Sequence, residues 1–202
     1  MSTDFSGRAL PSSLSWTRRP AASTFSVGGG AFRWQTQDAD IHPPTTPLAS
    51  VLTERAPRGD YVVETRVAVN TPATGDGTNY VQGGLVVYGD DGNYVRLTSN
   101  SIFDTRQTEF GKEVTPVPAG SPNYGNQVVG PVGSATTLRI VHRVVGSTQT
   151  YTASTSVDGR HFDKGGTWTA ALGSTPRIGL ISLGGSGFTS TFDYLRVSAV
   201  AR

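Results

Sequence analysis

The 202-residue sequence has no cysteine, and charged residues make up only 16% of it. The absence of cysteine excludes disulfides, thiolate zinc sites and a cysteine nucleophile. No stretch approaches the roughly 20 consecutive apolar residues that a membrane-spanning helix requires. The first ten residues, MSTDFSGRAL, also lack the apolar core of a signal peptide. We therefore expect no membrane association and no targeting segment within this sequence.

Runs of basic residues are absent as well. The formal net charge is +2, and Arg18 and Arg19 are the only adjacent pair among the 17 Lys and Arg residues. A protein that binds nucleic acid uses clustered basic side chains to neutralise successive phosphates. We therefore expect no nucleic-acid partner.

What the sequence does contain is short alternating runs of apolar and polar residues, without the three- and four-residue spacing of an amphipathic helix. In residues 60–70, every second side chain from Tyr61 to Val69 is apolar or Thr. Clusters of Gly, Pro and Asp separate such runs, which is typical of strands joined by tight turns. The pattern predicts an all-β fold, namely a single two-sheet antiparallel sandwich of the jelly-roll type over residues 1–202.

Several of these runs predict particular strands. The last two strands of the chain are expected on either side of a GGSGF turn. Two Pro- and Gly-rich segments, 40–47 and 115–133, are predicted to be long surface loops, where function tends to be located. The expected strands are 80–88 paired with 94–98 across GDDGN, 137–145 paired with 148–157, and the final pair 177–183 and 190–200.

Short motifs in a fixed order resemble a known family. They are DFSG at 4–7, FRWQTQDAD at 32–40, DYVVETRV at 60–67, QGGLVVYGDDGNYVRL at 82–97, EFGKEV at 109–114, YTASTSVDG at 151–159, and GLISLGG followed by FDYLRV within 179–197. Together they span nearly the whole chain and resemble the concanavalin A-like β-sandwich module found C-terminal to family 43 glycoside hydrolases. The resemblance implies a secreted or cell-surface setting and a non-catalytic accessory role in the degradation of arabinose- or xylose-containing polysaccharides. Because the catalytic domain is not part of this sequence, the resemblance also implies a module excised from a longer parent chain.

Candidate sugar-binding residues are the outward-facing polar and aromatic side chains of the predicted strands. Sugars are bound by aromatic planes and by charged or amide groups that hydrogen-bond to hydroxyls. Tyr124 and Asn126 are included because side chains of the predicted loop can overhang a shallow groove. The strand-borne candidates form one polar strip if their strands are neighbours in one sheet; they are Glu64, Arg66, Gln82, Tyr88, Arg96, Glu109 and Arg139.

The sequence gives little support for catalysis. Glu109 and Glu113 are the best pair of carboxylates for glycoside hydrolysis, but on a strand they stand roughly 13 Å apart. Retaining and inverting glycosidases place their carboxyl groups about 5 to 9.5 Å apart. We therefore expect a carbohydrate-binding module without activity of its own. Two alternatives stay open: a stand-alone glycoside hydrolase, and a purely structural domain that packs against a catalytic partner.

Calcium is the metal that this sequence best accommodates, because it accepts carboxylate and carbonyl oxygens from loops. Asp4 precedes the first predicted strand and Asp193 lies in the last. In a jelly roll the two termini come together, and related sandwich modules often hold calcium in such a place. Asp4 and Asp193 are therefore the predicted ligands of a structural calcium ion, with local capping and hydrogen bonding as the alternative role.

Overall fold

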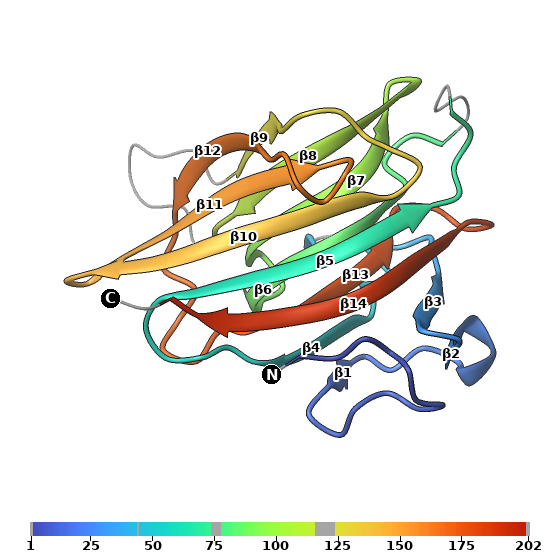
Figure 1. Ribbon diagram of the computed structural model, residues 1–202, viewed down its shortest axis with the longest axis horizontal. Helices are drawn as coiled ribbons and strands as arrows, with labels where there is room; N and C mark the ends of the chain where they lie inside the picture. The colour runs from blue at the N-terminus through green and yellow to red at the C-terminus, as the bar shows by residue number, and fades with distance from the viewer. Residues whose placement is uncertain (1, 44, 74–77, 116–123, 201–202) are drawn as a thin grey trace.

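The computed structural model describes residues 2–43, 45–73, 78–115 and 124–200, which form two packed antiparallel sheets of seven strands each (Figure 1). This confirms the predicted all-β sandwich. Within the described ranges, the one helical segment is the 3-10 turn Ala22–Thr24, so none of them holds a helix that could cross a membrane.

We name the two sheets after central strands. The β6 sheet has the order β1 (Ser15–Thr17), β4 (Val51–Arg55), β13 (Arg177–Leu183), β6 (Gln82–Asp90), β7 (Asn93–Ile102), β8 (Thr105–Glu113), β9 (Tyr124–Val128). The β5 sheet has the order β12 (Asp163–Thr169), β11 (Thr148–Ser156), β10 (Thr136–Val145), β5 (Tyr61–Val69), β14 (Thr189–Ala199), β3 (Ala31–Gln35), β2 (Phe25–Gly28). In Figure 1 the β5 sheet faces the viewer and the β6 sheet lies behind it.

The alternation of inward and outward side chains along the strands produces the core of the sandwich. Along β5 every second side chain from Tyr61 to Val69 is buried, and those between are half-buried. The inward side chains of both sheets meet in one apolar core, as expected for stacked sheets about 10 Å apart. Its largest fully buried members include Trp34, Tyr61, Tyr151, Phe5, Phe32, Phe110 and Phe192.

The predicted hairpins form as expected. Strands β6 and β7 pair with Tyr88 opposite Tyr94, and strands β10 and β11 pair from Thr137 and Ser156 to Val145 and Thr148. Gly92, in the turn between β6 and β7, has a φ of 92°, a conformation that L side chains rarely adopt. The Asp91-Gly92 turn therefore needs its glycine to reverse the chain tightly between β6 and β7.

One expectation is corrected. Of the segment 115–133, predicted as a loop, residues 116–123 lie outside the described ranges and Tyr124–Val128 form strand β9, which pairs with β8 from Glu109 and Val128 to Glu113 and Tyr124. The final two strands lie on either side of a glycine-rich turn as expected, with β13 in the β6 sheet and β14 in the β5 sheet. The glycine-rich turn between them therefore crosses from one sheet to the other.

The two ends of the chain meet as predicted. The backbone amide and carbonyl of Thr3 exchange hydrogen bonds with those of Leu195 in β14, at 2.8 and 2.9 Å. On its other side β14 pairs with β5 along nearly its whole length. The last strand of the chain thus lies inside its sheet, between β5 and β3.

Candidate functional site

A polar groove of about 420 Å³ lies on the outer face of the β6 sheet. Its floor comes from the outward side chains of β6, β7, β8 and β9, which the antiparallel registers bring side by side. The segment that follows β3 forms a wall. The lining residues are Asp40, His42, Tyr80, Gln82, Tyr94, Arg96, Glu109, Glu113, Tyr124 and Asn126.

Arg96 and Glu109 form the central ion pair of this groove. Arg96 Nη2 donates to Glu109 Oε1 at 2.8 Å, and Asn100 Nδ2 donates to Glu109 Oε2 at 2.7 Å. The side chains of Arg96 and Glu109 are 11% and 2% exposed. Burial opposes the charged form of Arg96, but Tyr94, Glu109 and Asp40 raise its pKa above the ordinary value. The groove therefore holds a fixed, ionised guanidinium whose position is set by a buried carboxylate.

The same cluster presents polar atoms without partners. Arg96 Nε and Asn100 Oδ1 are buried, and neither has a hydrogen-bond partner among the residues that the structure describes. Gly111 keeps the space beside Arg96 Nε open, because a Cβ there would stand 2.6 Å from Asn126 Oδ1 and 3.1 Å from Arg96 Nε. A buried unpaired donor or acceptor costs about 1 to 3 kcal/mol. A ligand with hydroxyl groups, which both donate and accept, would satisfy both atoms.

A second carboxylate lies at the far end of the groove. Glu113 Oε1 is 3.3 Å from His42 Nδ1, and the Glu113 side chain is 5% exposed. Burial raises the pKa of Glu113, while His42 and Arg96 act in the opposite direction. Asp40 Oδ1 stands 3.8 Å from Arg96 Nη1 on the same wall. The groove thus carries groups of both signs and is not a simple anion or cation site.

Tyrosine side chains border the groove. Tyr80 and Tyr124 are 49% and 54% exposed, whereas Tyr94 is buried. Tyr80 precedes β6 and its amide bonds to the carbonyl of Ser101, while Tyr124 opens β9 opposite Glu113. The two exposed rings therefore stand diagonally across the face. Aromatic planes of this kind can pack on the C–H faces of a sugar ring.

One of the predicted residues on this sheet lies outside the groove. Tyr88 is 6% exposed and belongs to a small apolar cluster between β6, β13 and the segment after β3. Its hydroxyl donates to Asp91 Oδ1 at 2.7 Å, and burial raises its pKa to about 12. Asp91 in turn accepts two hydrogen bonds from Arg18. Tyr88 therefore anchors the wall of the groove and does not line it.

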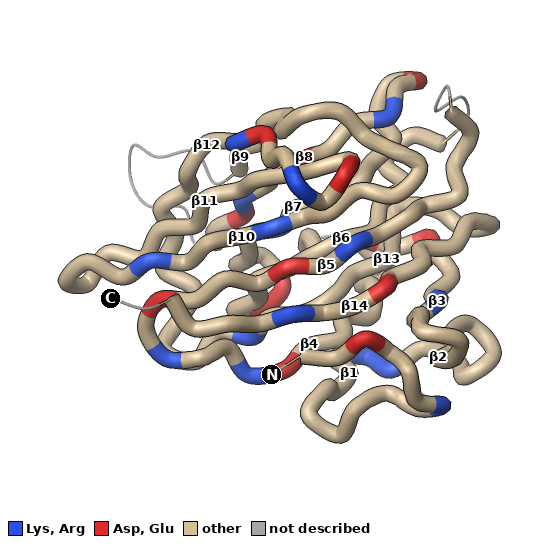
Figure 2. The backbone as a smooth tube through the Cα atoms, in the orientation of Figure 1, with Lys and Arg blue, Asp and Glu red and all other residues tan. Residues whose placement is uncertain are grey.

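The predicted single polar strip divides between the two sheets. Glu64, Arg66 and Arg139 lie on β5 and β10, on the opposite outer face of the sandwich. Figure 2 shows acidic and basic positions side by side on β10, β5 and β14. Arg139 Nη2 is 2.6 Å from Glu64 Oε2, and Tyr194 donates to Glu64 Oε1 at 2.8 Å. These residues lie in the other sheet and do not line the groove.

The predicted calcium ligands have other partners. Asp193 Oδ2 is 2.5 Å from Arg66 Nη1. Asp4 Oδ1 accepts the backbone amide of Ser6 at 3.0 Å, and the Ser6 side chain and amide lower the pKa of Asp4. No group of three His, Asp or Glu side chains suited to a metal occurs in the described ranges. These contacts do not test calcium binding, which stays a prediction.

Five groove residues are expected from the sequence: the alternation along the strands predicts Gln82, Arg96 and Glu109, and the segment 115–133 predicts Tyr124 and Asn126, which lie on strand β9 and not in a loop. The sequence does not predict the other residues of the groove and of its central cluster, namely Asp40, His42, Tyr80, Tyr94 and Asn100. For Tyr94 and Asn100 the signal is present, because they alternate with Arg96 along β7. For Asp40 and His42 no sequence signal places the segment after β3 against this face.

Two seven-stranded antiparallel sheets with a polar groove on one outer face define a sandwich of the concanavalin A-like class. Residues 2–189 match the family described as the beta xylosidase C-terminal concanavalin A-like domain, and the chain belongs to this family of C-terminal modules of family 43 glycoside hydrolases. A search of curated proteins found no match.

Solved structures show the same fold. A bifunctional GH43-CE protein of Bacteroides eggerthii aligns with a TM-score of 0.77 and 15% identity over 100% of this chain and 26% of its own length. A xylan beta-1,4-xylosidase of Bacillus halodurans aligns with a TM-score of 0.73 and 18% identity over 98% of this chain and 38% of its own. A functionally unknown protein of Saccharomyces cerevisiae aligns with a TM-score of 0.70 and 16% identity over 95% of this chain and 98% of its own. This chain therefore spans well under half of the two bacterial proteins.

Proposed function

We propose that this chain is a non-catalytic carbohydrate-binding module, and that its groove on the β6 sheet binds an arabinose- or xylose-containing polysaccharide. The observation that carries the proposal is the buried cluster of Arg96, Glu109 and Asn100, which leaves a donor and an acceptor without partners among the described residues. Vicinal sugar hydroxyls supply a matching donor and acceptor. The exposed rings of Tyr80 and Tyr124 add apolar contact surface at the two ends.

The choice of glycan and of setting rests on the family. The Bacillus halodurans relative is described as a xylan beta-1,4-xylosidase, and the matching family is named after beta xylosidases. A module of this kind would keep a catalytic domain of the same parent chain close to its polymer. Because such polymers occur outside cells, the proposal includes a secreted or cell-surface location.

The groove is poorly suited to hydrolysis. Both carboxylate oxygens of Glu109 accept hydrogen bonds, from Arg96 and Asn100, so both are already engaged within the protein. Glu113 is four residues further along β8, roughly 13 Å away along a strand. This exceeds the separation that either glycosidase mechanism uses. The proposed module therefore binds its glycan without cleaving it.

The test is calorimetry or affinity electrophoresis of the isolated chain with arabinoxylan. Tyr124→Ala and Gln82→Ala should each weaken binding about fivefold, which corresponds to roughly 1 kcal/mol for one lost contact. Arg66→Ala, on the opposite sheet, is the control and should bind like the wild type. If Arg66→Ala weakens binding while the two groove variants do not, the site lies on the β5 sheet and the proposed groove is wrong.

A reducing-sugar assay on the same samples separates the alternatives. Release of sugar by the wild type would identify a hydrolase. Absence of binding to every glycan tested would favour a structural domain that packs on a catalytic partner.

A further inference from the structure

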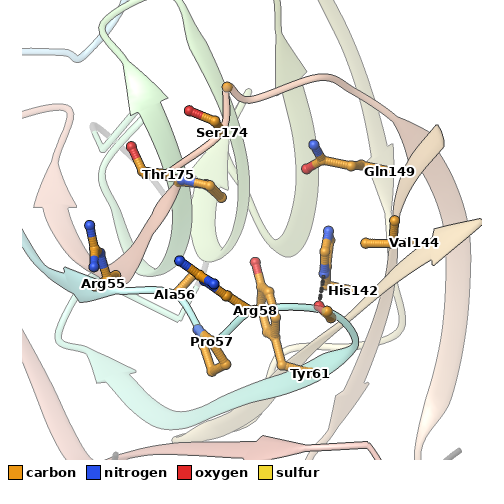
Figure 3. Close-up of a pocket in the computed structure, with 13 residues that line it drawn as sticks. Arg55, Ala56, Pro57, Arg58, Tyr61, His142, Val144, Gln149, Ser174 and Thr175 are labelled. Atoms are coloured by element: carbon orange, nitrogen blue, oxygen red, sulfur yellow. Dashed lines mark hydrogen bonds between the residues drawn. The ribbon is translucent and has the colours of Figure 1, made fainter. Parts of the chain in front are cut away.

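A second pocket, of about 360 Å³, opens at one end of the sandwich, where the two sheets separate (Figure 3). It is lined from the β6 sheet by Arg55 at the end of β4 and by residues 173–176 before β13, and from the β5 sheet by the starts or ends of β5, β10 and β11. Its volume lies within the roughly 300 to 1,000 Å³ that small-molecule sites occupy. The pocket shares no lining residue with the groove, so a ligand bound in it is independent of the function proposed for the groove.

Two buried polar atoms in this pocket have no partner. Tyr61 is 0% exposed and His142 is 4% exposed, and their rings stack with centroids 4.5 Å apart. Neither Tyr61 Oη nor His142 Nε2 makes a hydrogen bond to any residue that the structure describes. Figure 3 shows the Tyr61 hydroxyl directed toward the space between Arg58 and His142.

The chemistry of these two atoms differs. Burial lowers the pKa of His142, while the Gly59 carbonyl and the Gln149 side chain act in the opposite direction. In the neutral ring, Nδ1 donates to the Gly59 carbonyl at 2.9 Å, so Nε2 carries a lone pair and accepts. Burial raises the pKa of Tyr61, so its hydroxyl stays protonated and can donate. A ligand must therefore offer a donor to His142 and an acceptor to Tyr61.

The charge of the pocket is positive. Arg55 and Arg58 are exposed at its rim, and none of its lining residues is acidic. The carboxylate of Asp60, which lies between the lining residues Gly59 and Tyr61, holds Arg143 Nη1 at 3.1 Å and the amide of Val144 at 2.9 Å. Two guanidinium groups that face a small pocket favour a carboxylate, which they bind with paired hydrogen bonds.

We propose that this end pocket binds a hydroxylated carboxylate of monosaccharide size, namely a uronic acid unit. The carboxylate lies against Arg58 and Arg55, one hydroxyl donates to His142 Nε2, and a second oxygen accepts from Tyr61. A simple carboxylate cannot donate to His142, and a neutral sugar leaves the two guanidinium groups without a counter-charge. The ligand therefore needs both a carboxylate and a hydroxyl group that can donate.

The experiment is an NMR titration of the folded chain with D-glucuronate, with D-glucose and acetate as comparison ligands. We expect saturable shifts of the amides around Tyr61 and His142 with glucuronate, and at least about tenfold weaker binding of glucose and acetate. Tyr61→Phe keeps the ring and removes only the hydroxyl, and Arg58→Gln removes an exposed charge. Each should weaken glucuronate binding roughly tenfold, the effect of one charged or buried hydrogen bond.

Arg143→Gln removes a nearby guanidinium that does not line the pocket and should bind glucuronate like the wild type. The inference is overturned if glucuronate gives no saturable shifts, if glucose or acetate binds equally well, or if Tyr61→Phe and Arg58→Gln both bind like the wild type.

Discussion

The Arg66 guanidinium and the Asp193 carboxylate form an ion pair between β5 and β14, with Nη1 and Oδ2 2.5 Å apart. Asp193 is one of the two carboxylates that the sequence assigns to calcium. The side chains of this pair are 43% and 40% exposed. The pair therefore neutralises Asp193 at the surface, and a cation at this carboxylate has to compete with the guanidinium.

The first prediction concerns that competition. If calcium binds at Asp4 and Asp193, millimolar EDTA should lower the melting temperature of the chain, because a ligand that binds only the native state raises its stability by mass action. Asp193→Asn should abolish this fall. A melting temperature that EDTA leaves unchanged would show that Arg66, and not calcium, holds the carboxylate of Asp193. Thermal unfolding followed by circular dichroism decides between these results.

A second prediction concerns the buried pair at the centre of the groove. Arg96→Met should lower the free energy of unfolding by about 3 to 5 kcal/mol, because it leaves Glu109 buried without its counter-charge. Arg143→Met is the matched control. It breaks the more exposed pair with Asp60, for which a loss of about 1 kcal/mol or less is expected. Urea denaturation measures both, and equal losses in the two variants would contradict a structural role for the buried pair.

A third prediction concerns acid stability. The pKa of His142 is lowered in the folded chain by burial, whereas in the unfolded chain this histidine titrates near its ordinary value of about 6.5. Below that pH the unfolded state binds more protons, so stability present at pH 7.5 should be lost as the pH falls toward 5. His142→Asn should reduce this loss in urea denaturation measured at the two pH values.

His161 supplies the control for that measurement. It is exposed, and its hydrogen bond to Asp158 raises its pKa, so its protonation favours the folded state as the pH falls. His161→Asn should therefore leave the acid loss unchanged or slightly larger. An acid loss that is the same in His142→Asn and the wild type would show that another group titrates.

The alternation of apolar and polar residues predicts most of the strands. It does not predict how the strands are arranged, and this explains the wrong prediction of a single polar strip. It identifies which side chains of a strand face the core, as for Tyr61 and Val63 in β5. It does not say which sheet a strand joins, so it places Glu64 and Glu109 on one strip although they lie on opposite faces. Pairing of non-neighbouring strands is decided by the packing of the whole chain.

The errors around β9 and the groove wall have a different cause. Pro and Gly in 115–133 favour a loop by local propensity, yet pairing with β8 makes Tyr124–Val128 a strand. Tertiary context overrides β propensity in such short segments. The wall that contains Asp40 and His42 is fixed by contacts of Ile41 and Ala49 with Val86 and Ile181, which no local pattern encodes.

The position of β14 inside its sheet has a consequence for folding. Until the last residues of the chain are available, β5 lacks its neighbour on one side, and β3 and β2 are separated from the rest of their sheet. Contacts between residues as distant as Thr3 and Leu195 close slowly, because long loops must be ordered before such contacts form. Until β14 is in place, the unpaired backbone edge of β5 stays open to pairing with other chains. Truncation of the last strand should therefore produce aggregation and not a smaller folded sandwich.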